Sequence, residues 1–452
     1  MAATQNRDMG SGSIPKLLAQ LALPAVVAQV VNLLYNIVDR IYIGHMPEVG
    51  ASALTGVGLF TPILMLITAF AMLCGSGGAP RAAIAMGRGD DDAAEKIMGN
   101  CFTLLLILAA VLTVVFYFAA PSLLVLFGAS EKTLPYALDY ARIYIIGTIF
   151  VLIVMGMNPF VTTQGFATFS MMTTVIGAVC NIILDPILIF GLFGFPRMEV
   201  AGAALATVIG QICGALLALM FNLRKNTDVH FQLKNLRPSA PIIGGIYSVG
   251  VPSIAMQSIG SVMMFGMNRI LISFTEAATA VFGAYFKLQS FIFMPCFGLN
   301  NAMVPIVSYN YGAQKFDRVR KTVRLTVFTA IGIMCVGCAL FELIPETLLG
   351  MFSPTDEMLS IGRVALRIIG VHFPLAGFSI IAGSACQALG KPIYALINSV
   401  CRQIVVLLPA AYLLSLTGRL ELVWLSFPIA EIVSVIMNAA FLKRTYRASL
   451  GE

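Results

Sequence analysis

Four polar side chains recur along one face of the first long apolar segment, residues 21–44. The four residues follow one another at spacings of three, four and three: Gln29, Asn32, Asn36 and Asp39. At about 100° per residue, these spacings place them in one narrow sector of a helix. An ionisable side chain at the centre of a membrane span costs about 2.5 kcal/mol or more, and it persists mainly where it faces a bundle interior or a water-filled path. We therefore expect this stripe to line a cavity and Asp39 to bind an ion there.

A second carboxylate occurs at a matching depth in another apolar segment. Asn181 and Asp185 are spaced by four, and Asp185 precedes the end of its segment near Leu192 by about seven residues. Asp39 lies about 8 Å inside the end of its own segment, at 1.5 Å per residue. Thr207, in the span that follows Asp185, lies at the same depth in the membrane. Two carboxylates in one poorly hydrated site disfavour the state in which both are ionised, as a proton carrier requires. The alternative is that both acids cap helices or pair with Arg40 near the headgroups.

The composition shows what kind of elements must position these groups. Of the 452 residues, 59% are hydrophobic and only 11% are charged, against roughly 25% charged in soluble domains. The mean hydropathy is +0.91. The chain is therefore predicted to be an all-α polytopic membrane protein. Apolar runs of membrane length predict twelve spans, at 17–43, 54–79, 100–127, 137–163, 169–192, 200–223, 243–272, 281–309, 325–349, 363–388, 394–416 and 422–442.

Loop charge predicts the orientation of these spans. The side that holds the N-terminus carries 18 Lys and Arg residues, and the opposite side carries three: Lys132, Arg197 and Arg419. By the positive-inside rule both termini are cytoplasmic, in a multi-pass protein of the cell inner (plasma) membrane. The net charge of +7 then reflects topology and contact with membrane lipid rather than binding of nucleic acid. The polar start of the chain leads directly into a full-length span, so we expect no removable signal segment.

The two halves of the chain resemble each other at a spacing of 225 residues. Pro80 matches Pro305 and Gly87 matches Gly312, and in both halves a basic loop follows. Six spans per half is an even number, so the halves have the same orientation and form two six-helix bundles related by a pseudo-two-fold axis along the membrane normal. The predicted organisation is an N-terminal lobe, a cytoplasmic linker and a C-terminal lobe, at 1–223, 224–241 and 242–452.

The second half offers a different set of side chains for binding. Gln257, Ser261, Met264 and Asn268 share one helix face, and Met294 follows in the next span. Flexible thioethers near several phenylalanines suit varied ligands, so we expect these residues to line a substrate cavity together with the stripe of residues 29–36. Each Met or Phe alone is more readily explained by packing or lipid contact. Arg402 and Glu431 are both buried by position, and we expect them to pair across helices.

Several sequence motifs of this chain resemble those of the multidrug and toxic compound extrusion transporters, in particular the bacterial drug exporters. The likeness extends over nearly the whole chain. The stretches that carry it are Leu23-Pro24, 36–40 (NIVDR), Pro80 to Gly87, Gln164-Gly165, 181–186 (NIILDP), 202–207 (GAALAT) and Gln387 to Pro392.

The resemblance implies two lobes that form a V around a central cavity, with a proton or sodium site in the N-terminal lobe. The residues that it assigns to this site are Asp39, Asp185, Asn181, Thr207 and Asn158. It implies a monomeric antiporter of small molecules, without a cofactor, a metal or catalytic residues. Some members bind sodium through acids in helices seven and ten. Spans seven and ten contain no acid here, which argues against that route.

Three alternatives remain at this level. A lipid-linked oligosaccharide flippase shares the superfamily fold, but only Arg269, Lys287 and Arg402 could bind its pyrophosphate. An integral membrane prenyl transferase would need magnesium-binding acids, for which the 90–92 cluster (DDD) is the sole candidate, and a charged helix N-terminus explains that cluster better. A major facilitator transporter also has twelve helices. The basic motif that such transporters carry after their second span is matched only weakly here, at 87–90 (GRGD).

Overall fold

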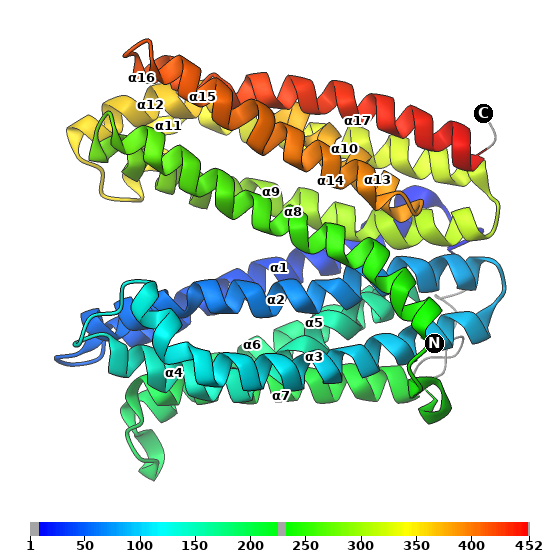
Figure 1. Ribbon diagram of the computed structural model, residues 1–452, viewed down its shortest axis with the longest axis horizontal. Coiled ribbons are helices and arrows are strands. Elements are labelled where there is room, and N and C mark those ends of the chain that lie inside the picture. Colours follow the sequence, from blue (N-terminus) through cyan, green and yellow to red (C-terminus); the bar gives the residue numbers. More distant parts are fainter. Residues whose placement is uncertain (1–8, 225–231, 451–452) are drawn as a thin grey trace. The chain divides into compact units, whose positions relative to one another are not determined.

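A computed structural model describes residues 9–224 and 232–450, and helices make up nearly all of this part of the chain (Figure 1). Ten of the described helices are long and apolar enough to cross a membrane, and two further pairs of helices each form one bent span. The prediction of an all-α protein with twelve spans is confirmed. The described residues divide into two compact units. Unit 1 comprises residues from Leu23 to Gly250, and unit 2 combines Met9–Ala22 with residues from Val251 onward.

Unit 1 contains most of the first helix and the spans that follow it. The helices are α1 (Ile14–Gly44), α2 (Gly50–Gly87), α3 (Asp91–Leu126), α4 (Leu134–Ile146), α5 (Thr148–Thr163), α6 (Ala167–Phe190) and α7 (Glu199–Arg224), with short 3₁₀ segments η2 (Leu192–Gly194) and η3 (Leu233–Leu236). Asp90 caps α3 by accepting a hydrogen bond from the backbone N–H of Ala93 at 3.0 Å. The cluster of three aspartates thus begins a helix, as the charge pattern predicted.

Unit 2 repeats this arrangement with more breaks. Its helices are the part of α8 (Ala240–Ile272) from Val251 onward, α9 (Glu276–Gly312), α10 (Phe316–Leu343), α11 (Pro345–Gly350), α12 (Asp356–Gly370), α13 (Phe373–Ala388), α14 (Pro392–Val400), α15 (Leu408–Ser415), α16 (Leu420–Val423) and α17 (Ser426–Leu450). A π-helical turn, η4 (Cys401–Leu407), joins α14 to α15 within one span. Such turns insert an extra residue into a helix and frequently occur at functional sites.

The two bent spans occupy corresponding places in the repeat. α4 and α5 meet at 55° at Gly147, and α12 and α13 meet at 48° at Val371 and His372. A Cβ on Gly147 would lie 2.5 Å from the Val208 side chain, so glycine permits the close approach of α7 at this bend. Pro374 is the second residue of α13 and has no N–H to continue α12. Both segments were predicted as single spans, 137–163 and 363–388, without a bend.

The closest helix packing in unit 1 joins α6 to α7, which lie side by side in Figure 1. A Cβ on Gly210 would lie 2.5 Å from the carbonyl oxygen of Gly177, and one on Gly177 would lie 2.9 Å from that of Gly210. Small residues at a membrane helix interface allow backbones to approach closely and gain dispersion energy. These two glycines therefore determine the distance between the helices that present Asp185 and Thr207.

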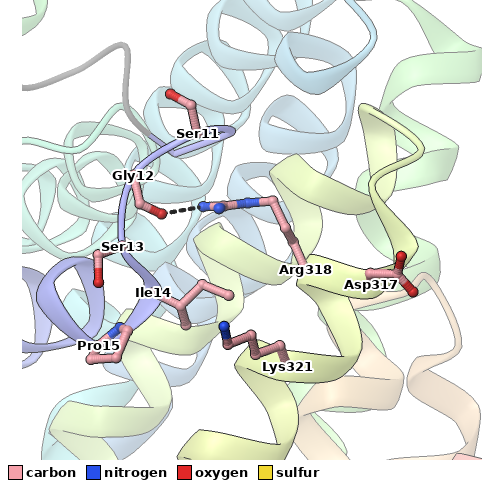
Figure 2. A pocket seen from close by; sticks show the side chains of 8 residues that line it. All are labelled: Ser11, Gly12, Ser13, Ile14, Pro15, Asp317, Arg318 and Lys321. Atoms are coloured by element: carbon pink, nitrogen blue, oxygen red, sulfur yellow. Dashed lines mark hydrogen bonds between the residues drawn. The ribbon is translucent and has the colours of Figure 1, made fainter.

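The segment that leads into α1 belongs to unit 2 and is held there by several hydrogen bonds, of which Figure 2 shows the one between Arg318 and Gly12. Arg318 Nη2 donates to the carbonyl oxygens of Met9 and Gly12 at 3.1 and 2.8 Å, and Lys315 Nζ donates to that of Gly10 at 2.7 Å. Asn310 Nδ2 donates to Met9 O at 2.9 Å, and its Oδ1 accepts from Arg318 Nε at 3.0 Å. Arg318 thus holds the segment that precedes α1 against α10.

Replacing Arg318 with alanine is expected to release residues 9–13. Hydrogen bonds to charged groups contribute about 1.5–3 kcal/mol each. Losing the two bonds from Arg318 to the carbonyl oxygens of Met9 and Gly12 should therefore raise amide hydrogen exchange in this segment at least about ten-fold. Arg324→Ala is the matched control, because Arg324 is exposed and its guanidinium carbon lies over the ring of Phe328, 5.8 Å from the ring centroid. Hydrogen exchange with mass spectrometry gives the comparison. Equal protection in both variants would contradict the role of Arg318.

The connection between the two halves packs on unit 1. The predicted linker, 224–241, includes residues 225–231, which lie outside the described residues. Glu95 of α3 accepts hydrogen bonds from Gln232 Nε2 at 3.0 Å and from Asn235 Nδ2 at 3.2 Å. Asn100 Oδ1 accepts from the backbone N–H of Ser239 at 2.7 Å. The described end of the connection is therefore bound to α3, and the lobe boundaries stay a prediction.

Candidate functional site

The two carboxyl groups singled out from the sequence meet inside unit 1. Asp39 is 7% exposed and Asp185 is fully buried. Each lies within electrostatic and hydrogen-bonding reach of the other. Asp39 Oδ1 and Asp185 Oδ2 are buried and have no hydrogen-bond partner among the described residues. Because an unsatisfied buried oxygen is costly, the pair is suited to accept a proton or a cation.

Amide and hydroxyl groups hold Asp185 in place. Asn181 Nδ2 donates to Asp185 Oδ1 and to Thr207 Oγ1, at 3.2 Å in each case. Thr207 Oγ1 donates in turn to the carbonyl oxygen of Ala203 at 3.0 Å. Asn181 and Thr207 are 2% and 5% exposed. The spacing of four between Asn181 and Asp185 puts both on the α6 face that packs against α7, so one amide can bridge the two helices.

Asn158 is not hydrogen-bonded to this cluster. Its Nδ2 donates to Thr173 Oγ1 at 2.8 Å, and its Oδ1 accepts from Thr173 at 3.1 Å. This bridge links α5 to α6 within unit 1. The role of Asn158 at the ion site stays a prediction.

Aromatic residues that the sequence analysis did not identify complete the cluster. Tyr140 lies on α4, where it is buried near Asp39 and Thr207. Its ring stacks on Tyr144 at a centroid distance of 6.0 Å, and Phe60 of α2 packs on both rings at 5.6 and 5.3 Å. The i, i+4 spacing of the two tyrosines on an amphipathic helix was the available signal. These rings exclude water from one side of the carboxyl pair.

The residues predicted to line a substrate cavity lie on helices of both units. On α1, Gln29 is half-buried, whereas Asn32 and Asn36 are exposed, and Asn36 Nδ2 donates to the Asn32 carbonyl oxygen at 2.6 Å. In unit 2, Gln257 and Ser261 of α8 are exposed, and three residues are half-buried: Met264, Asn268 and Met294. That the rows line one cavity stays a prediction.

The predicted pairing of Arg402 with Glu431 is confirmed. Arg402 Nη1 donates to Glu431 Oε2 at 2.9 Å, and Glu431 is 2% exposed. The pair joins the π-helical turn η4 to α17. Breaking a buried pair by removing one partner leaves an uncompensated charge, so the two residues stabilise each other within unit 2.

Together, these features define a class of protein. The chain consists of membrane-length helices, and it buries two adjacent carboxyl groups with their amide and hydroxyl partners inside one bundle. Ionisable groups in such a position are typical of membrane transport proteins built from repeated helical bundles.

Comparisons with known proteins identify the family. The family model described as MatE matches residues 24–187 and 252–413, and the chain belongs to this family. The multidrug export protein MepA of Staphylococcus haemolyticus is 26% identical over 426 residues, which cover 94% of this chain and 92% of MepA. An FAD transporter of Shewanella oneidensis is 24% identical over 426 residues, covering 94% of this chain and 93% of its own length.

A solved structure shares the fold over the full length. It is an outward-facing multidrug resistance MATE family transporter of the MOP superfamily, with a TM-score of 0.91, 26% identity and complete coverage of both chains. The resemblance stated from the sequence motifs is thereby confirmed. The protein is a MATE-type efflux transporter with many membrane-spanning helices, and its relatives are transporters rather than enzymes.

Proposed function

We propose that this protein is a secondary antiporter that exports amphipathic, mainly cationic organic compounds across the plasma membrane. Entry of protons or sodium ions bound at Asp39 and Asp185 drives the export. The observation that carries the proposal is the buried carboxyl pair, in which one oxygen of each acid has no hydrogen-bond partner among the described residues. The name of the relative MepA, a multidrug export protein, supports the substrate class.

The mechanism follows from competition for negative charge. With both carboxyl groups ionised, the site attracts a cation, and the polar stripe on α1 offers amides to the same ligand. Uptake of a proton or sodium ion lowers the negative charge of the pair and weakens that attraction, so the drug and the coupling ion favour different states. Because the two ligands oppose each other, binding of one lowers the affinity for the other by the same factor.

Transport under separate gradients tests this function. The protein is reconstituted in vesicles, and ethidium movement is followed by fluorescence under a proton gradient alone and under a sodium gradient alone. We expect transport against the ethidium gradient in at least one condition and none when both gradients are dissipated. Gradient-independent transport, or no transport of ethidium and of a fluoroquinolone, would contradict the proposal.

A further inference from the structure

A small cavity in unit 2 contains acidic, basic and neutral polar side chains. Its volume is about 40 Å³, and its lining includes Tyr285, Gln289, His372, Arg402 and Glu431. About 10–15 Å³ is enough for one water molecule, which needs two to four polar partners. The cavity therefore has the size and the polar lining to hold water within a membrane-spanning bundle.

Two buried polar atoms at this cavity have no partner in the described residues. They are Tyr285 Oη and Glu431 Oε1, on side chains that are 1% and 2% exposed. Leaving such buried groups unsatisfied is unfavourable. Arg402 satisfies only the other oxygen of Glu431, at 2.9 Å. The cavity thus offers a free carboxylate oxygen and a free phenol to a bound species.

His372 supplies a group that can gain a proton at the same place. Its Nδ1 is 2.5 Å from the carbonyl oxygen of Ile369, and since a carbonyl only accepts, Nδ1 carries hydrogen and donates. In the neutral ring Nε2 is then an unprotonated acceptor. His372 is 3% exposed, and its ring packs on Phe427 at 6.0 Å, as does that of Tyr285 at 5.6 Å.

The charges that act on His372 come from two elements. Glu431 of α17 and Arg402 of η4 both interact with it electrostatically, and Tyr285 of α9 faces the same cavity. The neighbouring helices α10 and α13 contribute the rings of Phe341 and Phe373 there. With a neutral imidazole the carboxylate and guanidinium cancel, so one added proton leaves the site with one net positive charge.

Irregular backbone converges on this cavity. His372 lies at the break between α12 and α13, and Arg402 lies on the π-helical turn. At the repeat spacing of 225 residues, His372 corresponds to Gly147 at the break between α4 and α5, and Tyr285 corresponds to Phe60. Thr207 corresponds to position 432, next to Glu431. The cavity therefore lies beside the bend of unit 2 that corresponds to the α4–α5 bend of unit 1.

A buried polar stripe continues from Glu431 along α17. Ser434, Asn438 and Thr445 follow at spacings of three, four and seven, and all are at most 1% exposed. Ser434 Oγ bonds Ser379 Oγ at 3.2 Å and accepts from Asn398 Nδ2 at 3.0 Å. Asn438 Nδ2 donates to the Ser379 carbonyl oxygen at 3.2 Å. Hydrogen-bonded polar groups thus extend from the cavity toward the C-terminal end of α17.

We propose that the cavity formed by Tyr285, His372, Arg402 and Glu431 is a second proton-binding site, separate from the Asp39–Asp185 pair. A proton binds Nε2 of His372, and the imidazolium is stabilised by Glu431, directly or through water in the cavity. The Glu431 carboxylate then interacts with two cations, Arg402 and the His372 imidazolium. Its ion pair with Arg402 becomes weaker, and so does the contact between η4 and α17. The site makes the packing of unit 2 depend on pH without any substrate present.

The only tryptophan of the chain provides a local probe. Trp424 is 1% exposed and precedes Phe427, whose backbone N–H donates to the Trp424 carbonyl oxygen at 3.3 Å. Phe427 lines the cavity. Acidification of purified protein from about pH 8 to about pH 5, without substrate or gradient, is expected to change Trp424 emission in one sigmoidal step. An emission that does not respond to pH would overturn the proposal.

Matched variants assign the change to the cavity. In His372→Gln we expect the amplitude to fall about ten-fold, to the baseline. His45→Gln is the control, since His45 makes the same kind of ring contact, with the Ile41 carbonyl at 2.8 Å, but lies in unit 1. Asp39→Asn with Asp185→Asn should also keep the full change. Retention in His372→Gln, or loss in the Asp39/Asp185 double variant, would overturn the proposal.

Two further measurements cover the remaining outcomes. Should His372→Gln fail to fold, Glu431→Gln is expected to move the midpoint to lower pH by about one unit or more, because the imidazolium loses its opposite charge. An unmoved midpoint would contradict the site.

Replacing potassium with about 150 mM sodium at fixed pH and ionic strength should leave the emission unchanged. A sodium-dependent change would assign the cavity to a metal cation and overturn proton binding. Because none of these readouts involves transport, their failure is distinct from failure of the antiport function.

Discussion

Asp39→Asn is expected to reduce gradient-driven export to the level of vesicles without protein. Asparagine has nearly the same shape as aspartate but cannot take up or release a proton, so the coupling step is lost. The fold should persist, because Asp39 Oδ1 makes no hydrogen bond in the described structure and Asp185 keeps its bond from Asn181. The measurement is ethidium export in reconstituted vesicles under an imposed gradient, with protein insertion checked separately.

A second aspartate provides the control for this substitution. Asp92 lies at the start of α3, where it is exposed and pairs with Lys96 at 2.5 Å. Exposed pairs of this kind contribute little to stability, so Asp92→Asn should export at the normal rate. Undiminished drug resistance or export in Asp39→Asn would count heavily against the carboxyl pair as the coupling site.

Gly210→Ala is expected to destabilise unit 1 and to impair export together. The added methyl would lie 2.5 Å from the carbonyl oxygen of Gly177 and 3.4 Å from the Asn181 side chain. A backbone carbonyl in a helix cannot move aside alone, so α6 and α7 must separate. Overpacking of this kind costs about 1–3 kcal/mol. The hydrogen bond from Asn181 to Thr207, at 3.2 Å, should lengthen as the helices separate.

Thermal denaturation in detergent and export in vesicles measure the two effects. We expect a midpoint lowered by about 2–4 °C per kcal/mol, by analogy with soluble domains of similar size, and a clear drop in export rate. Gly58→Ala on α2 is the matched control, because a Cβ there would meet no atom within 4 Å. If Gly210→Ala matched Gly58→Ala in both measurements, close packing of α6 on α7 would not be what positions the site.

Much of the fold could be predicted because the bilayer imposes a simple requirement. A chain in hydrocarbon must satisfy its backbone hydrogen bonds within each segment, so long apolar runs become helices and their number can be counted. The bends in two of the spans could not be predicted from the apolar runs. One arises where Gly147 allows Val208 to approach, a contact between residues 61 positions apart. The π-helical turn at Cys401–Leu407 likewise occurs inside a continuous apolar run.

The acids of the candidate site could be found because polar residues are rare in such a chain. Helical spacing placed Asp185 and Asn181 on one face, and depth counting put Asp39 and Thr207 at the same level. Neither argument could find Tyr140 or Phe60, since aromatic residues are common in apolar segments and only packing distinguishes them. For Asn158, which the family resemblance assigned to the site, the structure shows a hydrogen bond to Thr173, and its role at the ion site stays a prediction.

The class of protein, the spans and the carboxyl groups that require burial all follow from the order of residues, because hydrophobicity and charge act locally along the chain. The tertiary structure alone decided which helices touch, since this depends on where glycines permit close approach, as at Gly177 and Gly210. It also decided that His372, Tyr285 and Glu431 share one cavity. These three residues lie far apart in sequence, and no spacing rule relates them, so only the packing of α9, α17 and the break between α12 and α13 brings them together.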